Sequence, residues 1–220
     1  MRARFVPWQL GQLPSTARRS LGSESSILTR MNDEPLILVD ERNRAVGSAG
    51  KTAVHQQGLL HRAFSIFMVD ERGRILLQRR NPEKYHSGGL WANSCCGHPR
   101  PGERTLAAAR RRLDEELGVA DPLRFAFFAR YRTDLDNGMQ ENEFVYVYFG
   151  ALRCPPRPNP AEISQIELLT AAEINRRIKR EPNSFTFWLK HYFQNHFAEI
   201  ARLANEHASS PLSAATPGRR

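Results

Sequence analysis

The chain has 220 residues, 40% of them hydrophobic, and a formal net charge of +9. A chain of this size can bury one sizeable core, so we expect one folded domain with tails. Its longest apolar runs are too short or too interrupted to cross a bilayer, and no signal-peptide pattern opens the chain. These features predict a cytoplasmic protein without a membrane partner.

The positive charge is concentrated at the two ends of the chain. Residues 1–30 hold five arginines against one glutamate, and residues 205–220 hold two arginines against one glutamate. The charge that remains is modest for a domain that handles an anionic substrate, and basic tails are commonly solvated. We therefore expect no nucleic-acid partner. Only three cysteines are present, two of them adjacent, which favours a reducing compartment and a chemical role for one thiol.

Composition also predicts the domain boundaries. Residues 1–30 are rich in Arg and Ser, which is typical of a disordered basic extension or a transit-like leader, and Met31 offers a second plausible start. The folded domain is expected over residues 31–205. Residues 206–220 are predicted to form a disordered tail.

The expected elements alternate between strands and helices. A short strand over 36–39 is followed by two strands, 64–69 and 74–78, that are joined by a turn in which Gly73 suits a positive φ. Apolar residues at helical spacing predict a helix over 103–117 that Gly118 ends. Further segments follow: strands over 123–132, 143–152 and 161–169, then helices over 170–180 and 185–205. The order predicts an α/β (α+β) fold, a mixed sheet sandwiched between helices.

Three histidines and two glutamates could share one metal ion. Glu141 and Glu143 are two residues apart in a strand, so their side chains leave the same face. His55 and His61 flank the entry to an earlier strand, and His98 follows the cysteine pair. Three nitrogens and two oxygens leave one octahedral position free. Each residue alone is better explained as an ordinary surface or hydrogen-bonded side chain, so only the combination indicates a site.

A second set of residues is suited to binding phosphate. Arg112 and Glu116 are four residues apart on the predicted helix and share one stripe at the edge of its core face. Lys51, Arg80 and Lys84 could join Arg112 as cations. The alternative is a solvated basic rim.

Cys96 is the candidate acid or base. Its position near a predicted helix N-terminus and several cations predicts a stabilised thiolate. Adjacent residues of an extended segment point opposite ways, so only Cys95 or Cys96 can face the site, and Cys95 is better explained as a core residue. Trp188 and Tyr131 offer aromatic faces to a carbocation, whereas Trp91 is expected in the core.

The segment from Gly97 follows most of the Nudix signature. The matching residues are Gly97, Glu103, Arg111, Leu113, Glu115, Glu116, Gly118 and Val119. At the first Glu of the signature's Arg-Glu pair, this chain has Arg112 instead. With this helix, the segments 60–65, 91–99, 131–132 and 141–143 resemble type 1 isopentenyl diphosphate isomerase, over roughly residues 33–200.

The resemblance implies a Nudix fold and the interconversion of isopentenyl and dimethylallyl diphosphate, a small-molecule substrate. It implies a metal site, filled by Mg²⁺ or Mn²⁺ with Zn²⁺ as a further option, at His55, His61, His98, Glu141 and Glu143. A second Mg²⁺ would bridge Glu116 and the diphosphate, which Lys51, Arg80, Lys84 and Arg112 would bind. Cys96 and Glu143 match the family's catalytic residues, with Tyr131 assisting Glu143 and Trp188 lying over the reacting carbons. A monomer or weak dimer is expected.

Two other functions are consistent with parts of the sequence. A Nudix hydrolase would release phosphate and tolerate loss of Cys96, but Arg112 weakens the carboxylate cluster that hydrolysis uses. A basic binding module without catalysis would bind nucleic acid with a steep salt dependence. The complete set of His and Glu residues argues against that second alternative.

Overall fold

The computed structural model describes residues 33–135 and 138–209. The predicted basic extension of residues 1–30 lies outside the described residues. The compact unit that contains the predicted site residues begins at Glu34.

Strand β3 (His61–Val69) organises the sheet. Eight of its nine residues are buried, as expected for a strand covered on both faces. It pairs in parallel with β8 (Gln140–Ala151) along its whole length, and antiparallel with β6 (Cys95–Gly97) on its other side. Its two ends also pair with β1 (Pro35–Val39) and β4 (Ile75–Arg80).

The remaining strands extend this sheet. They are β2 (Ala45–Gly50), β5 (Trp91–Ala92), β7 (Leu123–Asp134) and β9 (Ile163–Leu169). Antiparallel pairing joins β2 to β1, β5 and β9 to β4, and β7 to β8. The predicted mixed sheet between helices is confirmed.

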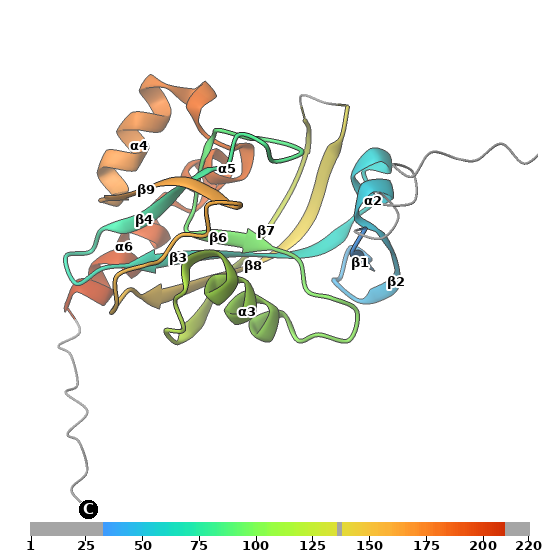
Figure 1. Ribbon diagram of the computed structural model, residues 1–220, viewed down its shortest axis with the longest axis horizontal. Helices are drawn as coiled ribbons and strands as arrows, with labels where there is room; N and C mark the ends of the chain where they lie inside the picture. Colours follow the sequence, from blue (N-terminus) through green and yellow to red (C-terminus); the bar gives the residue numbers. More distant parts are fainter. Residues whose placement is uncertain (1–32, 136–137, 210–220) are drawn as a thin grey trace, which may run out of the picture. The chain divides into compact units, whose positions relative to one another are not determined.

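Helices cover both faces of the sheet (Figure 1). Alternate residues of β3 point to opposite sides, so that Phe67 joins one buried cluster while Phe64 and Ile66 join the other. Helix α3 (Thr105–Leu117) packs on the Phe64 side. The other face is covered by α4 (Ala171–Arg180), α5 (Phe187–Asn195) and α6 (Phe197–Ser209).

Helix α3 ends where the sequence predicts. Gly118 is left-handed, with φ 61°, and its N–H donates to the Asp114 carbonyl at 2.8 Å. Leu113 and Leu117 are fully buried, and each contributes roughly 1.5–3 kcal/mol by leaving water. The helix begins at Thr105, two residues later than predicted.

The C-terminal helices differ from the prediction. A single helix over 185–205 is wrong: α5 ends at Asn195, and His196 adopts φ −131° before α6 begins. The His196 ring stacks on Phe127 at 4.2 Å between centroids, so a tertiary contact accompanies the break. Helix α6 continues to Ser209, past residue 205, where the folded domain is predicted to end. Residues 210–220 lie outside the described residues.

Helix α2 (Lys51–Gln57) was not predicted. It follows the β1–β2 hairpin directly, and Gly58 ends it in a left-handed conformation with φ 60°. With seven residues it has too few turns for a clear periodic signal. This helix carries both Lys51 and His55, and so it positions two of the predicted site residues.

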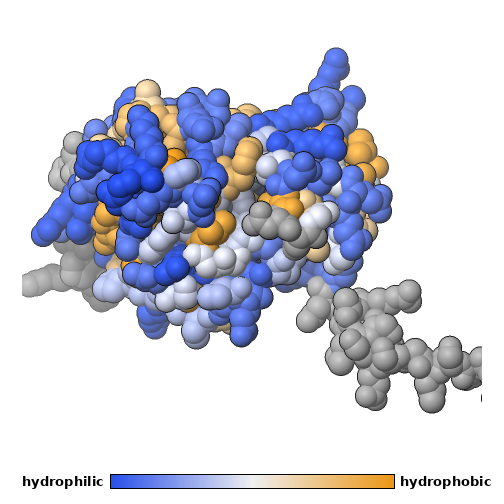
Figure 2. All heavy atoms as spheres, turned by 90° about the horizontal axis from the view of Figure 1, so that it is seen from above, coloured by the Kyte–Doolittle hydropathy of each residue, from blue (hydrophilic) through white to orange (hydrophobic). Residues whose placement is uncertain are grey.

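No helix among the described residues is long and apolar enough to cross a membrane. On the face shown in Figure 2, hydrophilic residues predominate and hydrophobic residues form small separate groups.

Candidate active site

The register of the central strands brings the predicted catalytic residues onto one face of the sheet. Cys96 on β6 lies opposite Ser65 of β3, and Glu143 on β8 lies opposite His61 of the same strand. Tyr131 on β7 lies opposite Glu143 in turn. Directly opposed residues share a face, and this is the face that α5 covers with Trp188.

A cavity of about 210 Å³ opens on this face. The predicted residues that line it are Lys51, Arg80, Lys84, Cys96, His98, Arg112, Glu116, Tyr131, Glu141, Glu143 and Trp188. His55 and His61 are fully buried beside it. The geometry therefore brings the predicted metal ligands, cations and proton-exchanging groups to one place.

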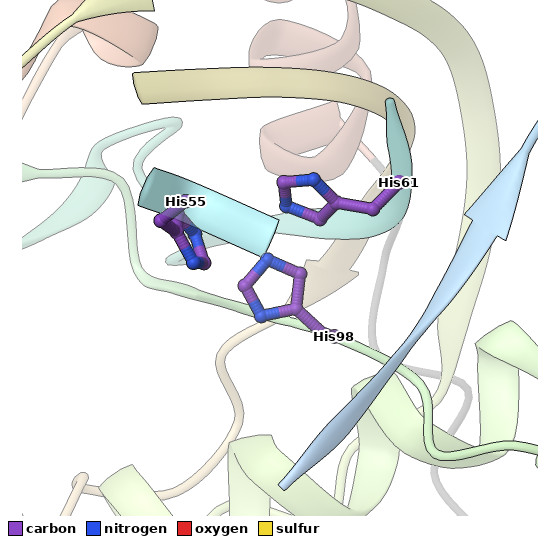
Figure 3. A group of neighbouring side chains, drawn as sticks. All are labelled: His55, His61 and His98. Atoms are coloured by element: carbon purple, nitrogen blue, oxygen red, sulfur yellow. The ribbon is translucent and has the colours of Figure 1, made fainter. Parts of the chain in front are cut away.

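The three predicted histidine ligands come from separate elements and converge (Figure 3). His55 lies on α2, His61 on β3, and His98 just after β6. The ring centroid of His61 lies 5.0 Å from that of His55 and 5.0 Å from that of His98. A ligand nitrogen from each can be chosen so that all three lie within 4.8 Å of one another.

The hydrogen bonds of the buried histidines fix which nitrogen faces the centre. Nδ1 of His55 lies 2.7 Å from the Lys51 carbonyl, and Nδ1 of His61 lies 2.9 Å from the Leu59 carbonyl. A carbonyl only accepts, so each Nδ1 must carry a proton, and in the neutral ring each Nε2 then has a free lone pair. The two Nε2 atoms and Glu141 Oε2 are buried without a hydrogen-bond partner.

These three orphaned atoms all present electron pairs to one another. His55 Nε2 lies 3.3 Å from Glu141 Oε2, and His61 Nε2 lies 3.9 Å from it. A cation between them would satisfy all three, whereas an apolar or empty centre would leave each desolvated at a cost of roughly 1–3 kcal/mol. Imidazole nitrogen and carboxylate oxygen suit a divalent metal, so the residues present fit such an ion.

Glu143 divides its two oxygens between different neighbours. Oε1 lies 2.9 Å from His98 Nε2 and 3.6 Å from His61 Nε2, on the side of the histidines. Oε2 accepts a hydrogen bond from the Tyr131 hydroxyl. Burial acts to raise the pKa of Glu143, but the adjacent His61 and His98 side chains outweigh it and hold the pKa well below the usual range. Glu143 is therefore ionised and can accept a proton.

The predicted phosphate-binding residues line the cavity and are partly paired with acids. Arg112 contacts Glu116 one turn along α3, and Lys84 contacts Glu162. Burial lowers the pKa of Lys51, and the charges of Lys84 and Arg80 lower it further. The positive charges near Lys51 repel one another, and an anion bound in the cavity would reduce this repulsion.

Cys96 departs from the predicted thiolate. It lies on β6, and α3 begins only at Thr105, so Cys96 is not in the first turn of that helix. Burial raises the pKa of the Cys96 thiol to about 12, with Arg80 opposing the shift. The predicted stabilised thiolate is therefore wrong for this state of the protein, because desolvation outweighs the nearby cation. Cys95 points to the opposite core, as predicted, and Trp91 is buried as predicted.

Several lining residues were missed, among them His86 and Glu162. His86 lies in the loop between β4 and β5, and Glu162 immediately precedes β9. Neither has a partner at a diagnostic spacing in the sequence. The only local signal at His86 is the glycine pair that follows shortly after it. The residues that the His86 side chain faces come from distant segments of the sequence.

Comparison with known proteins agrees with this site. A model of the NUDIX domain matches residues 59–189. The isopentenyl-diphosphate Delta-isomerase 2 of Aromatoleum aromaticum is 48% identical over 71% of this chain and 83% of its own length. The isopentenyl-diphosphate Delta-isomerase of Serratia proteamaculans is 47% identical over 78% of this chain and 98% of its own. The chain belongs to the isopentenyl-diphosphate Delta-isomerase family of Nudix proteins.

Solved structures resemble this member of the isomerase family in fold. A crystal structure of a Deinococcus radiodurans protein matches with a TM-score of 0.59 at 24% identity, covering 79% of this chain and 98% of the other. The MutT protein of Methanosarcina mazei matches with a TM-score of 0.53 at 17% identity, covering 66% and 94%. Both likenesses concern the fold alone.

Proposed function

We propose that this protein interconverts isopentenyl diphosphate and dimethylallyl diphosphate. One cavity is lined by Cys96 and by the Glu143–Tyr131 pair, and this observation carries the proposal. The reaction needs a proton added at C4 and another removed at C2 of the same molecule. Relatives at 47–48% identity carry the name of this isomerase.

The metal is proposed to bind at His55, His61, His98, Glu141 and Glu143. The support is the set of buried lone pairs described above, which a cation would satisfy. When bound, a divalent ion would supply positive charge that fixes Glu143 and polarises its carboxylate. The residues do not distinguish Mg²⁺, Mn²⁺ and Zn²⁺, because all three accept nitrogen and oxygen ligands.

The diphosphate is proposed to bind the cations of the cavity. Lys51, Arg80, Lys84 and Arg112 are the candidates, and Glu116 would hold a Mg²⁺ that accompanies the diphosphate. Arg112 can present two parallel N–H groups to phosphate oxygens, which suits it to this part. When the diphosphate binds, a phosphate oxygen would replace the Glu162 carboxylate as the partner of Lys84.

The two proton-exchanging groups start in complementary protonation states. Cys96 keeps its proton, whereas Glu143 is ionised and accepts a hydrogen bond from Tyr131. A shift of a double bond needs one group that gives a proton and one that takes a proton. After each turnover the two groups have exchanged roles, and the reverse reaction restores them. The resting charges thus support a reversible reaction at this pair.

Trp188 is proposed to stabilise the carbocation. Protonation of an alkene leaves a tertiary cation, and a buried indole face attracts positive charge by about 2 kcal/mol in a desolvated site. Trp188 is buried, lines the cavity and already has the Arg80 guanidinium 5.4 Å from its ring centroid. Exclusion of water by this side chain would also prevent capture of the cation.

One experiment tests the reaction directly. The protein is incubated with isopentenyl diphosphate and Mg²⁺ in D₂O, and the products are analysed by NMR. We expect dimethylallyl diphosphate that carries deuterium. Absence of both product and deuterium would overturn the proposal.

Variants separate isomerisation from Nudix hydrolysis. Cys96→Ala and Glu143→Gln should each lower the isomerisation rate by at least about 100-fold, since each removes a proton-exchanging group. Neither should change phosphate release, which we expect to be negligible throughout. Cys154→Ala is the matched control, because Cys154 is exposed and lies outside the cavity. Phosphate release that survives Cys96→Ala would favour a hydrolase.

A further inference from the structure

His86 lies in a tightly constrained loop. Ser87 adopts φ 51° and Gly89 φ 75°, so the backbone turns through left-handed conformations directly after His86. A Cβ added to Gly88 would meet the Pro82 carbonyl oxygen at 2.3 Å, so no larger residue fits there without a shift. Arg80 Nη2 donates to the His86 carbonyl at 3.2 Å. These constraints fix the path of the backbone at His86.

The ring of His86 is directed at the proposed metal centre. Its Nε2 lies 3.5 Å from Glu141 Oε1, and its centroid lies 5.9 Å from that of His55. Nδ1 lies 3.3 Å from the Ser87 hydroxyl. If that hydroxyl donates to Nδ1, the ring proton is on Nε2 and faces the carboxylate. The 3.5 Å contact needs to shorten by only a few tenths of an ångström to become an ordinary hydrogen bond.

Glu141 then has two oxygens with opposite surroundings. Oε2 faces the lone pairs of His55 and His61 and has no hydrogen-bond donor. Oε1 faces the Nε2 of His86. A carboxylate that binds an ion through one oxygen is commonly held by a donor at the other, which fixes its orientation and its basicity.

We propose that His86 is a positioning residue that holds Glu141 by its Oε1, so that Oε2 points at the metal. This inference rests on the proposed metal site and adds a residue to it. The His86 ring also lies beside Trp188, with 6.0 Å between the ring centroids, so His86 contacts both a proposed metal ligand and the indole.

The geometry favours this role over direct ligation. Among the described residues, the clusters with metal-ligand spacing combine His86 with His55 and Glu141 but not with His61, His98 or Glu143. His86 is therefore within ligand spacing of His55 and Glu141 but not of the other three proposed ligands. His86 contacts Oε1 of Glu141, whereas His61 contacts Oε2 of the same carboxylate.

The experiment measures Mn²⁺ affinity by calorimetry on metal-free protein. His86→Ala removes the donor and should weaken binding about 10- to 100-fold, the range seen when such supporting residues are lost. His86→Gln places an amide N–H near the position of Nε2 and should stay within about threefold of the unchanged protein. Ser87→Gly suits the left-handed backbone and removes the hydroxymethyl group that contacts Nδ1, so it should weaken binding by a smaller factor.

His207→Asn is the matched control. His207 is half-buried near the end of α6, where its Nδ1 contacts the Leu203 carbonyl, and it does not line the cavity. The Mn²⁺ affinity of the His207→Asn variant should equal that of the unchanged protein. Thermal unfolding of every metal-free variant, recorded first, identifies any that fails to fold, and in that case Ser87→Gly and His86→Gln provide the test.

Each outcome is decisive. Unchanged affinity in His86→Ala would overturn the positioning role while leaving the metal site intact. Equal losses in His86→Ala and His86→Gln, with one histidine nitrogen fewer in the electron-spin-echo spectrum of bound Mn²⁺, would make His86 a ligand and overturn it as well. Failure of the unchanged protein to bind Mn²⁺ would instead overturn the metal site itself.

Discussion

Arg112 and Glu116 lie one turn apart on α3 and contact each other at the edge of the cavity. Arg112 stands where the Nudix signature has a glutamate, so the helix presents a cation beside the carboxylate. Burial raises the pKa of Glu116, and the charge of Arg112 opposes that shift. The pair therefore places a cation beside one buried carboxylate, and the same cation can bind phosphate.

Replacing Arg112 by Glu completes the Nudix signature and should weaken substrate binding. We expect KM for isopentenyl diphosphate to rise at least about tenfold, because a bidentate cation becomes a repelling carboxylate. The free energy of unfolding should fall by about 1–3 kcal/mol, since Glu116 loses its partner. Arg110→Glu is the control, with the same charge change on the exposed side of α3. Equal KM values for the two variants would contradict this prediction.

Replacing Tyr131 by Phe should slow catalysis without affecting binding. The change removes only the hydroxyl that donates to Glu143 Oε2. We expect kcat to fall about 10- to 100-fold with KM within about threefold, because Tyr131 acts on the proton-accepting oxygen and not on the diphosphate. Tyr148→Phe, on the opposite face of the sheet, should keep full activity. A rise in KM alone would place Tyr131 in substrate binding.

The local parts of the site were predictable from the sequence. Helix α3 and its end at Gly118 follow from apolar spacing, and the opposite directions of Cys95 and Cys96 follow from the alternation of an extended strand. The residues of the His and Glu set were also predictable, and the structure brings them together. Their roles as ligands remain a prediction.

Other features depend on contacts that no local pattern encodes. Helix α2 is too short to give a periodic signal, yet it carries Lys51 and His55. The break at His196 coincides with stacking on Phe127, a residue of a distant strand. The protonated state of Cys96 follows from desolvation, which is known only after the chain folds. The role of His86 could not be predicted for the same reason, because its contact Glu141 lies on a strand that is distant in the sequence.

The Cys96 thiol should resist alkylation at ordinary pH. Its raised pKa, about 12, moves formation of the reactive thiolate upward from the usual range near 8.5. In a Cys154→Ser background, we expect the iodoacetamide rate at Cys96 to keep rising above pH 9.5. Unfolded protein should instead level off near that pH. A plateau below pH 8 in the folded protein would show a stabilised thiolate.

The sign of the linked stability change follows from the same shift. The folded chain binds the Cys96 proton more tightly than the unfolded chain does. This contribution to stability is fully present below the unfolded pKa and is lost as pH rises toward the folded pKa. Cys96→Ala should therefore reduce the alkaline loss of stability, measured by urea unfolding between pH 8 and pH 10.

Removal of metal should lower thermal stability as well as activity. Chelation leaves His55 Nε2, His61 Nε2 and Glu141 Oε2 facing one another without a cation. Mn²⁺ at 100 times its Kd should stabilise the protein by about 2.7 kcal/mol, seen as a higher Tm in calorimetry. His61→Ala should abolish most of this gain, and His207→Asn should keep it. Equal Tm values with and without Mn²⁺ would contradict a site at these residues.

The parallel pairing of β3 with β8 has a consequence for how the protein is made. His55 and His61 leave the ribosome long before Glu141 and Glu143, which are carried by β8. Parallel strands so far apart in sequence pair slowly, because a long intervening chain must first be closed into a loop. Until then the early histidines can bind a stray ion only weakly. If the centre binds a metal as proposed, the complete set of ligands is available to it only late in synthesis.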